Sequence, residues 1–297
     1  MNCSVLMNIL KEGTQYMSKS VLVTGGAGFV GSHLCEKLHN LGHSVTSIDN
    51  YFTGSIKNHI NGVHYVSGDV GTINDVFKAR SFDLVYHMGE YSRVEQSFDD
   101  VQKVLDFNTK GINEVLKYCM SKGSKLIYAG SSTKYGDNGA DSSPYAFTKA
   151  KNTELVRNFG EWFGLNFAIT YFYNVYGCRE IETGAYATVI AKFKKLKQEG
   201  KPLPVVLPGT QLRNFTHITD IVNGLILVGE NGSGDGYAIG NSKAYSILEV
   251  AEMFDSELEL LPERRGNRMS ASLDTSKIKS LGWSETVNLE DYIRGCA

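Results

Sequence analysis

A glycine-rich turn between two apolar segments constrains this chain most. Residues 21–23 (VLV) have the composition of a buried strand, and residues 32–38 have helical periodicity, so residues 24–31 (TGGAGFVG) connect a strand to a helix. The first glycine permits the sharp bend, the second lets the backbone approach a pyrophosphate, and the third lets helix and strand pack closely. The residues of this predicted phosphate site at a helix N-terminus are Gly25, Gly28, Phe29, Val30 and Gly31.

An acidic residue completes the dinucleotide-binding pattern. Asp49 follows the predicted strand 44–48, at about the twenty-residue spacing of a ribose-binding acid. Its carboxylate would accept hydrogen bonds from ribose hydroxyls and repel a 2′-phosphate, so we predict NAD rather than NADP. The alternative is an ordinary strand–helix–strand unit with a surface aspartate. The intact order of strand, glycines, helix, strand and acid favours the cofactor.

Composition and charge exclude several functions. The 297 residues carry a formal net charge of −2, which gives no electrostatic footprint for nucleic acid or an anionic membrane. No apolar run approaches the length of a membrane span. The cysteines form no CxxC and lie near no histidine cluster, so we expect no metal site, reduced thiols and a cytoplasmic protein. They are Cys3, Cys35, Cys119, Cys178 and Cys296.

Predicted strands and helices alternate through the first 175 residues. The strands lie at 21–23, 44–48, 63–66, 84–87, 125–129 and 166–172. Helical patterns between them lie at about 73–80, 99–121 and 145–163. Such alternation is typical of a parallel sheet covered by helices on both faces. We therefore predict an α/β, Rossmann-type doubly wound fold.

The pattern becomes irregular after residue 175. Helices are predicted near 185–199, 219–229, 246–254 and 288–293. We expect three parts: an N-terminal extension at 1–16, an NAD-binding Rossmann domain at 17–174, and a smaller C-terminal α/β substrate-binding domain at 175–297, interlaced with the first or separate from it.

A tyrosine and a lysine lie one helical turn apart. Pro144 suits a helix start, and the four-residue spacing places Tyr145 and Lys149 on one helix face. A neighbouring ammonium group lowers the pKa of a phenol toward the range of a general base. The hydroxyl groups of residues 131–133 follow the preceding strand. Because the carboxyl ends of parallel strands meet at one edge of a sheet, these groups should converge on one cleft.

Five motifs stand in the order and spacing of the extended short-chain dehydrogenase/reductases. They are residues 25–31, 131–136, 145–149, 172–177 and 213–220. The chain most resembles the nucleotide-sugar epimerase/dehydratase branch, and within it UDP-glucose 4-epimerase-type proteins, from about residue 19 to the end. The resemblance implies a UDP-sugar or related nucleotide-sugar substrate. It also implies a homodimer, paired through the helices at about 99–121 and 145–163.

The resemblance also implies roles for matching residues. Tyr145 would be the general base on the sugar 4-hydroxyl, Lys149 would hold the nicotinamide ribose, and Ser131 would supply a catalytic hydroxyl, with Ser132 or Thr133 able to share that role. The cofactor-binding set further comprises Asp49, Asn50, Asp69, Val70, His87, Met88, Gly89 and Asn108. The substrate-binding set further comprises Glu90, Thr133, Asn174, Arg213 and Arg264. We expect His87 itself to be a core histidine hydrogen-bonded to backbone.

The reaction is inferred from what the catalytic turn lacks. Sugar 4,6-dehydratases of this family carry an Asp-Glu pair just after the catalytic hydroxyl, where this chain has Ser132 and Thr133, and the decarboxylases carry Glu at the position of Thr133. Neither hydroxyl can serve as a carboxylate acid or base. We therefore predict 4-epimerisation, by oxidation at sugar carbon 4 and hydride return to the other face. The alternatives are a nucleotide-sugar dehydrogenase or dehydratase, or a non-catalytic NAD-binding relative.

Glu90 departs from the family pattern. Relatives have His-x-Ala-Ala or His-x-Ala-Gly after the fourth strand, whereas residues 87–90 here are His-Met-Gly-Glu. This carboxylate could bind a sugar hydroxyl, pair with Arg93, or act as an acid or base in another reaction. Residue 214 also departs, because Asn214 follows Arg213 where the family usually has Asp.

Overall fold

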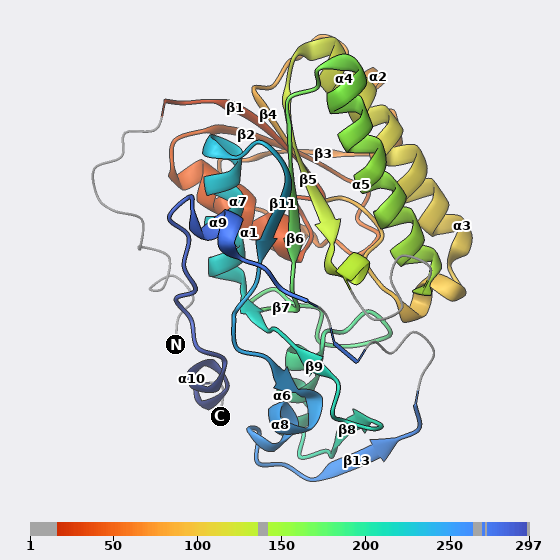
Figure 1. The fold of residues 1–297 in the computed structure, drawn as a ribbon, viewed down its shortest axis with the longest axis vertical. Coiled ribbons are helices and arrows are strands. Elements are labelled where there is room, and N and C mark those ends of the chain that lie inside the picture. The colour runs from red at the N-terminus through yellow and green to blue at the C-terminus, as the bar shows by residue number, and fades with distance from the viewer. Residues whose placement is uncertain (1–16, 136–141, 264–268, 271, 296–297) are drawn as a thin grey trace.

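A seven-stranded parallel sheet forms the centre of the molecule (Figure 1). The computed structural model describes residues 17–135, 142–263, 269–270 and 272–295. The sheet order is β11-β6-β5-β4-β1-β2-β3, which confirms the predicted α/β, doubly wound fold. Its strands are β1 (Ser20–Thr24), β2 (Ser44–Asp49), β3 (His64–Ser67), β4 (Leu84–His87), β5 (Lys125–Ser131), β6 (Phe167–Phe172) and β11 (Gly234–Ile239).

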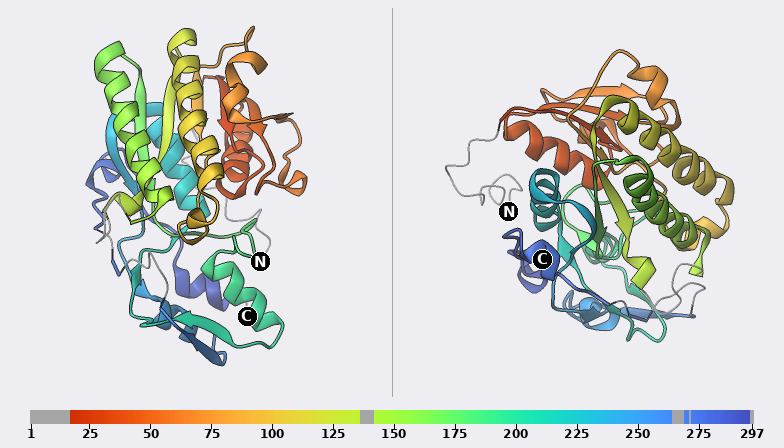
Figure 2. Two further views of the ribbon diagram at one scale, coloured as in Figure 1. Left: turned by 90° about the vertical axis from the view of Figure 1, so that its right-hand side faces the viewer. Right: turned by 45° about the horizontal axis from the view of Figure 1, so that its top comes forward.

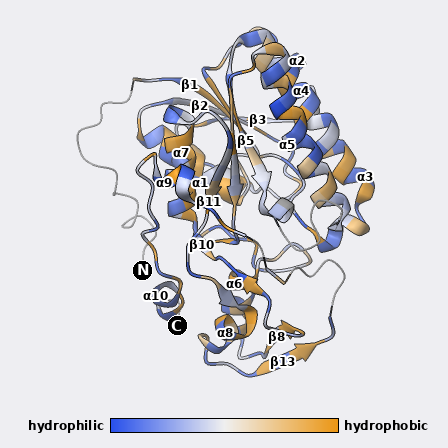
Figure 3. Ribbon diagram, viewed as in Figure 1, coloured by the Kyte–Doolittle hydropathy of each residue, from blue (hydrophilic) through white to orange (hydrophobic). Residues whose placement is uncertain are grey.

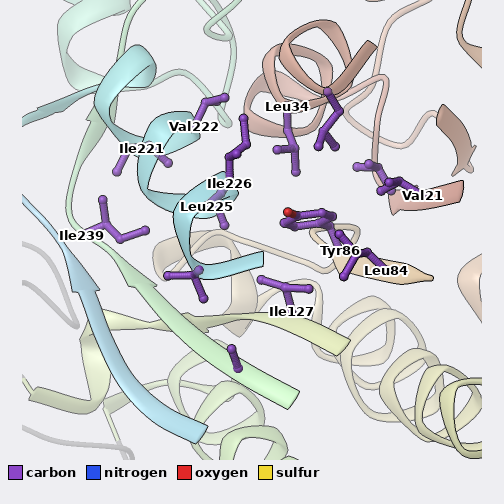
Figure 4. Close-up of a cluster of buried hydrophobic side chains, with 14 of the residues drawn as sticks. Val21, Leu34, Leu84, Tyr86, Ile127, Ile221, Val222, Leu225, Ile226 and Ile239 are labelled. Atoms are coloured by element: carbon purple, nitrogen blue, oxygen red, sulfur yellow. The ribbon is translucent and has the colours of Figure 1, made fainter. Parts of the chain in front are cut away.

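Helices α1 (Phe29–Asn40) and α7 (Ile218–Asn231) cover one face of this sheet. Leu34 of α1 and Leu225 of α7 pack with Tyr86, which projects from the central strand β4 and is fully buried (Figure 4). Leu34 and Leu225 are also fully buried. Removal of this apolar area from water stabilises the layer that carries the glycine turn.

The opposite face carries α2 (Ile73–Val76), α4 (Gly111–Lys122) and α5 (Pro144–Phe163). Figure 2 shows α4 and α5 side by side on this face. Hydrophobic and hydrophilic residues alternate along both helices in Figure 3, as expected for helices with one buried face. Large apolar side chains nevertheless remain exposed along this layer, namely Val76, Val101, Leu105, Met120, Phe147, Trp162 and Phe163.

The predicted helix at 99–121 is interrupted. The chain forms α3 (Val101–Val104), then a π-helical segment at Leu105–Lys110, then α4. The wider turn directs Asn108 inward, where it is fully buried. Such insertions often mark functional sites, and hydrophobic periodicity does not reveal them.

The chain beyond residue 175 contributes to two regions. Strand β11 pairs with β6, and α7 covers the central sheet, so both belong to the first unit. The remainder packs around a separate apolar cluster that includes Phe193 and Phe254. Its strands pair as β7 (Val175–Tyr176) with β10 (Thr216–His217), β8 (Leu203–Val206) with β13 (Leu258–Leu261), and β9 (Leu212–Arg213) with β12 (Tyr245–Ser246). Its helices are α6 (Val189–Gln198), α8 (Ile247–Glu252) and α10 (Leu289–Arg294). Helix α9 (Ser276–Lys279) packs beside β11 instead, and its Ile278 belongs to the core of the central sheet.

One of the three cysteines within the described ranges differs from expectation. Cys178 is disulfide-bonded, which corrects the prediction that all five are reduced thiols. Cys35 and Cys119 are free and buried, and burial raises the pKa of both thiols. None of the helices in the described ranges is long and apolar enough to cross a membrane. Those ranges also hold no cluster of metal-ligating side chains. The predicted extension at 1–16 lies outside them.

Candidate active site

A cleft of about 570 Å³ opens at the carboxyl ends of the central strands. This is the expected position of a ligand site in an open parallel sheet, and the volume lies in the range of small-molecule pockets. Most of the predicted site residues line it together. They are Gly25, Gly28, Phe29, Val30, Gly31, Asp49, Asn50, Asp69, Val70, Met88, Gly89, Glu90, Ser131, Ser132, Thr133, Tyr145, Lys149, Asn174 and Arg213.

The glycine turn brings two backbone segments into close contact. Gly25 has a φ of +73°, and a Cβ atom there would lie 2.7 Å from Cα of Gly89. A Cβ atom on Gly31 would lie 2.1 Å from the carbonyl oxygen of Gly25. Helix α1 starts beside this turn, with no side-chain cap at Gly28 and no acidic residue in its first turn. Its backbone N–H groups and positive dipole end therefore suit a phosphate group.

Asp49 ties the glycine turn to the end of β2. One carboxylate oxygen accepts a hydrogen bond from the Ala27 N–H at 2.9 Å, and the other accepts one from the Tyr51 N–H at 2.8 Å. Each oxygen has a second lone pair for a ribose hydroxyl. Asn50 donates to a carboxylate oxygen of Asp69 at 3.2 Å, so the residues predicted for the adenosine end form one connected group.

The predicted catalytic residues meet at the end of β5 and the start of α5. Ser143 caps α5 by accepting a hydrogen bond from the Ala146 N–H at 3.1 Å, and Pro144 occupies the first turn. Tyr145 therefore lies in the first turn of α5, where its hydroxyl donates a hydrogen bond to Ser131 Oγ at 3.0 Å. Ser131 Oγ also lies 2.9 Å from Thr133 Oγ1. These hydroxyls form a continuous chain through which a proton could be shared.

Glu90 forms an ion pair with Lys149, not with Arg93. The Lys149 ammonium group donates to Glu90 Oε2 and to the Ala129 carbonyl. Asn152 donates to Glu90 Oε1 at 2.9 Å, and Tyr128 donates to the same oxygen at 3.3 Å. Burial opposes ionisation of Glu90, but Lys149 and His87 outweigh it and lower its pKa to about 2. Glu90 is therefore a buried, ionised carboxylate.

Sequence reasoning missed two partners in this network. Asn152 follows Lys149 by three residues on α5, a spacing that places both on the same face. That spacing was a usable signal for Asn152. Tyr128 lies on β5, and its contact with Glu90 spans 38 residues of sequence. Only the sheet pairing of β4 with β5 brings the two elements together.

His87 and Asn108 lie beneath the cleft rather than in its wall. His87 is fully buried, as expected of a core histidine, but its Nδ1 lies 2.8 Å from the side-chain hydroxyl Oγ1 of Thr24 and not from a backbone group. Asn108 accepts from the Tyr91 N–H at 2.7 Å and donates to Thr148 Oγ1 at 3.1 Å. It thereby fastens the loop after β4 to α5.

Two charged residues of the cleft were not predicted as site residues. Arg93 donates to the Tyr186 carbonyl through Nε at 3.0 Å and through Nη2 at 2.7 Å. Glu180 accepts from the Gly177 N–H at 2.8 Å and from Thr188 Oγ1 at 2.5 Å. Burial raises the pKa of Glu180 to about 7, against the opposing effect of these hydrogen bonds. No pattern in the sequence distinguishes either residue from a surface charge.

The residues predicted to bind the substrate diphosphate lie at and beyond the end of β6. Asn174 has a φ of +31°, an unusual conformation for a residue other than glycine, and its carbonyl accepts from the Thr216 N–H at 3.2 Å. Arg213 is half-buried in β9 and lines the cleft. Arg264, the third residue predicted here, lies outside the described residues.

Comparison with known proteins identifies matches over most of the chain. The sequence profile of the NAD-dependent epimerase/dehydratase family matches residues 21–240. The chain is 31% identical over 260 residues to a UDP-N-acetyl-alpha-D-glucosaminuronate decarboxylase of Bacillus cytotoxicus, a match that covers 80% of this chain and 79% of the relative.

Two further matches differ in how much of the matched protein this chain covers. A trifunctional UDP-glucose 4,6-dehydratase/UDP-4-keto-6-deoxy-D-glucose 3,5-epimerase/UDP-4-keto-L-rhamnose-reductase of Arabidopsis thaliana is 26% identical over 318 residues, which cover 95% of this chain. The chain spans only 47% of that relative's length. The crystal structure of a UDP-glucose 4-epimerase from Thermotoga maritima with UDP-glucose superposes with a TM-score of 0.86 at 25% identity, covering 92% of this chain and 96% of the other.

Proposed function

Because this chain belongs to the NAD-dependent epimerase/dehydratase family, we propose that it is a nucleotide-sugar 4-epimerase and that its substrate is a UDP-sugar. The observation that carries the proposal is the catalytic turn. Tyr145 is hydrogen-bonded to Ser131, and the two residues that follow Ser131 are neutral. A sugar 4,6-dehydratase or a decarboxylase of this family would need a carboxylate at the position of Ser132 or Thr133. Among the relatives, a 4-epimerase and a decarboxylase both occur, and the neutral side chains of the catalytic turn support the 4-epimerase.

The cleft fits NAD. The uncapped start of α1 suits the pyrophosphate, and Asp49 suits the adenosine ribose while disfavouring a 2′-phosphate. Met88 and Gly89 line the cleft between the glycine turn and Lys149. When bound, NAD supplies the hydride acceptor and donor for chemistry at sugar carbon 4.

Side chains of the protein remove and return the proton of the sugar 4-hydroxyl. Tyr145 takes the proton of the sugar 4-hydroxyl as a general base, and Ser131 receives or orients it through the 3.0 Å hydrogen bond. The same tyrosine returns the proton after the 4-keto sugar has turned within the cleft. Small side chains at Ser131 and Ser132 leave room for that rotation. Asn174 and Arg213 hold the diphosphate, because a guanidinium group gives charge-assisted hydrogen bonds to phosphate oxygens.

Incubation with a panel of UDP-sugars, followed by NMR detection of 4-epimers, tests this function. The Tyr145→Phe variant should lose about 100-fold or more of the activity, since a general base contributes on that order. Tyr237→Phe is the matched control, because its hydroxyl bonds to Ser233 outside the cleft. Failure to interconvert any nucleotide-sugar would contradict the proposal. Net NADH release or loss of water would instead indicate the dehydrogenase or dehydratase.

We also propose that the protein forms a homodimer through the α3–α5 layer. Exposed Phe147, Trp162 and Phe163 lie on α5, with exposed fractions of 48%, 59% and 58%. Apolar side chains grouped along one layer favour association. Light scattering coupled to size-exclusion chromatography should give twice the 32.7 kDa chain mass, and Trp162→Glu should reduce it. A monomeric mass for the unaltered protein would refute this.

A further inference from the structure

We propose that the loop at 177–188, which joins β7 to α6, is a strap across the cofactor cleft, and that Tyr186 is the latch that holds it shut. NAD enters and leaves the cleft only when this strap opens. The proposal goes beyond the 4-epimerase reaction, because it needs NAD binding but no particular substrate. Tyr186 is a positioning residue, since it acts through the strap.

The strap is fastened to α1 where it begins. The Arg179 guanidinium group donates a hydrogen bond to Glu36 Oε2 at 2.7 Å. The Cys178 carbonyl oxygen accepts one from His33 Nε2 at 2.8 Å. Glu36 and His33 both belong to α1, the helix that follows the glycine turn. The strap therefore starts on the side of the cleft that suits the pyrophosphate group.

The strap is also closed on itself at its base. Glu180 accepts hydrogen bonds from the Gly177 N–H at 2.8 Å and from Thr188 Oγ1 at 2.5 Å. The Thr188 N–H donates to the Ile181 carbonyl at 3.1 Å. These bonds join the beginning of the strap to its end, so the residues between them form one compact loop. Such a loop moves as a unit when its outer contacts are released.

The far end of the strap is held by Tyr186. Residues 182–185 are exposed, whereas Tyr186 is half-buried. Its hydroxyl donates to Asp100 Oδ2 at 2.5 Å, and Arg93 donates to its carbonyl through Nε at 3.0 Å and through Nη2 at 2.7 Å. Its ring lies edge-on to Phe52, with the ring centroids 5.6 Å apart. Because hydrogen bonds to a carboxylate are stronger than those between neutral groups, the bond to Asp100 is the main contact of the latch.

The strap crosses the mouth of the cleft. Asp100 immediately precedes α3, which packs with α5 on the face of the sheet opposite to α1 (Figure 1). The strap therefore runs from one face of the sheet to the other, across the edge at which the cleft opens. Its own residues in the cleft wall are Glu180, Ile181, Ala187 and Thr188, and those on the side of the latch are Phe52, Tyr91, Arg93 and Phe107.

Opening of such a strap has a kinetic signature. Every contact of the latch joins protein groups, so the same contacts oppose the entry of NAD and its release. Weakening the latch should therefore raise the association and dissociation rate constants by the same factor and leave Kd unchanged. A residue that only contacts bound cofactor behaves differently, because its loss raises the dissociation rate constant and Kd together.

Stopped-flow fluorescence of NADH with the full chain tests the proposal. Dissociation is followed by displacing bound NADH with excess NAD, and association by mixing NADH with protein freed of cofactor. Tyr186→Phe keeps the ring but loses the bond to Asp100, so it should raise both rate constants about tenfold and change Kd by less than about twofold. Tyr186→Ala loses the ring contacts as well and should raise both rate constants about 100-fold.

A double variant identifies the partner of the latch. Because Asp100→Ala already removes the acceptor, adding Tyr186→Phe to it should not speed release further. Tyr237→Phe is the control and should change neither rate constant, because its hydroxyl bonds to Ser233 outside the cleft.

Three results would overturn the proposal. They are unchanged rate constants in Tyr186→Ala, an increase confined to dissociation with a matching rise in Kd, and additive effects in the double variant. None of these measurements needs a nucleotide-sugar, so the strap and the 4-epimerase proposals can fail separately.

Discussion

Replacing Glu180 with glutamine should stabilise the protein at alkaline pH and leave it unchanged at acidic pH. Glu180 is half-buried in the cleft wall, where it accepts hydrogen bonds from the Gly177 N–H and Thr188 Oγ1. Burial raises its pKa from 4.5 to about 7 in the folded protein. The neutral carboxyl is therefore favoured by folding, and glutamine resembles that neutral form in shape and hydrogen bonding.

The pH dependence has a definite sign. Below pH 4.5 the carboxyl group is neutral in the folded and in the unfolded protein, so it does not lower the free energy of unfolding. Between pH 4.5 and about 7 the unfolded chain loses its proton first, so the free energy of unfolding falls as pH rises. Above about pH 7 the free energy of unfolding stays at this lowered value. A shift of this size corresponds to about 3 kcal/mol.

Urea denaturation at pH 4 and pH 8.5, followed by circular dichroism, measures the effect. Glu180→Gln should match the unaltered protein at the lower pH and exceed its free energy of unfolding by about 3 kcal/mol at the higher pH. Glu182→Gln is the matched control, because Glu182 is exposed in the same segment. An equal difference between Glu180→Gln and the unaltered protein at both pH values would refute the argument from burial.

Three further substitutions test the cofactor side. Gly25→Ala should abolish NAD binding measured by calorimetry, because its Cβ atom would collide with Gly89. Gly42 also has a positive φ, of +87°, but open space around it, so Gly42→Ala should keep NAD binding and lower the free energy of unfolding by only about 1 kcal/mol. Equal NAD affinity in the two variants would exclude the collision. Asp49→Asn should reduce the ratio of NAD to NADP affinity by about tenfold or more, and an unchanged ratio would remove Asp49 from the ribose site. Thr24→Val should lower the free energy of unfolding by about 2–4 kcal/mol, because the Met88 and Gly89 N–H groups lose the hydroxyl oxygen that accepts their hydrogen bonds. A loss below about 1 kcal/mol would show that another acceptor replaces the Thr24 hydroxyl.

The sheet and the glycine turn were predictable because local sequence specifies them. Each buried parallel strand is a short apolar run, and the turn between β1 and α1 needs glycine for steric reasons at Gly25 and Gly31. The Tyr145–Lys149 spacing was similarly informative, since both lie on one helix face. Strand ends in a parallel sheet then bring these groups to a common cleft without further information.

The remainder depends on contacts between distant segments. Glu90 and Lys149 are 59 residues apart, and nothing in either local sequence indicates that they pair. The π-helical turn around Asn108 is invisible to helical periodicity. Strand β11 was not predicted within the central sheet, because it contains two glycines and follows an irregular region. Its strand character comes from pairing with β6.

The position of β11 has a consequence for synthesis on the ribosome. β6 ends at residue 172, yet the neighbour that pairs with it spans residues 234–239, and α7, which covers that part of the sheet, spans 218–231. A nascent chain that has emerged only as far as β6 therefore presents an unpaired strand edge and an uncovered apolar face around Tyr86. Such surfaces invite aggregation and chaperone binding. The nucleotide-binding layer can reach its final form only after roughly four-fifths of the chain has been made.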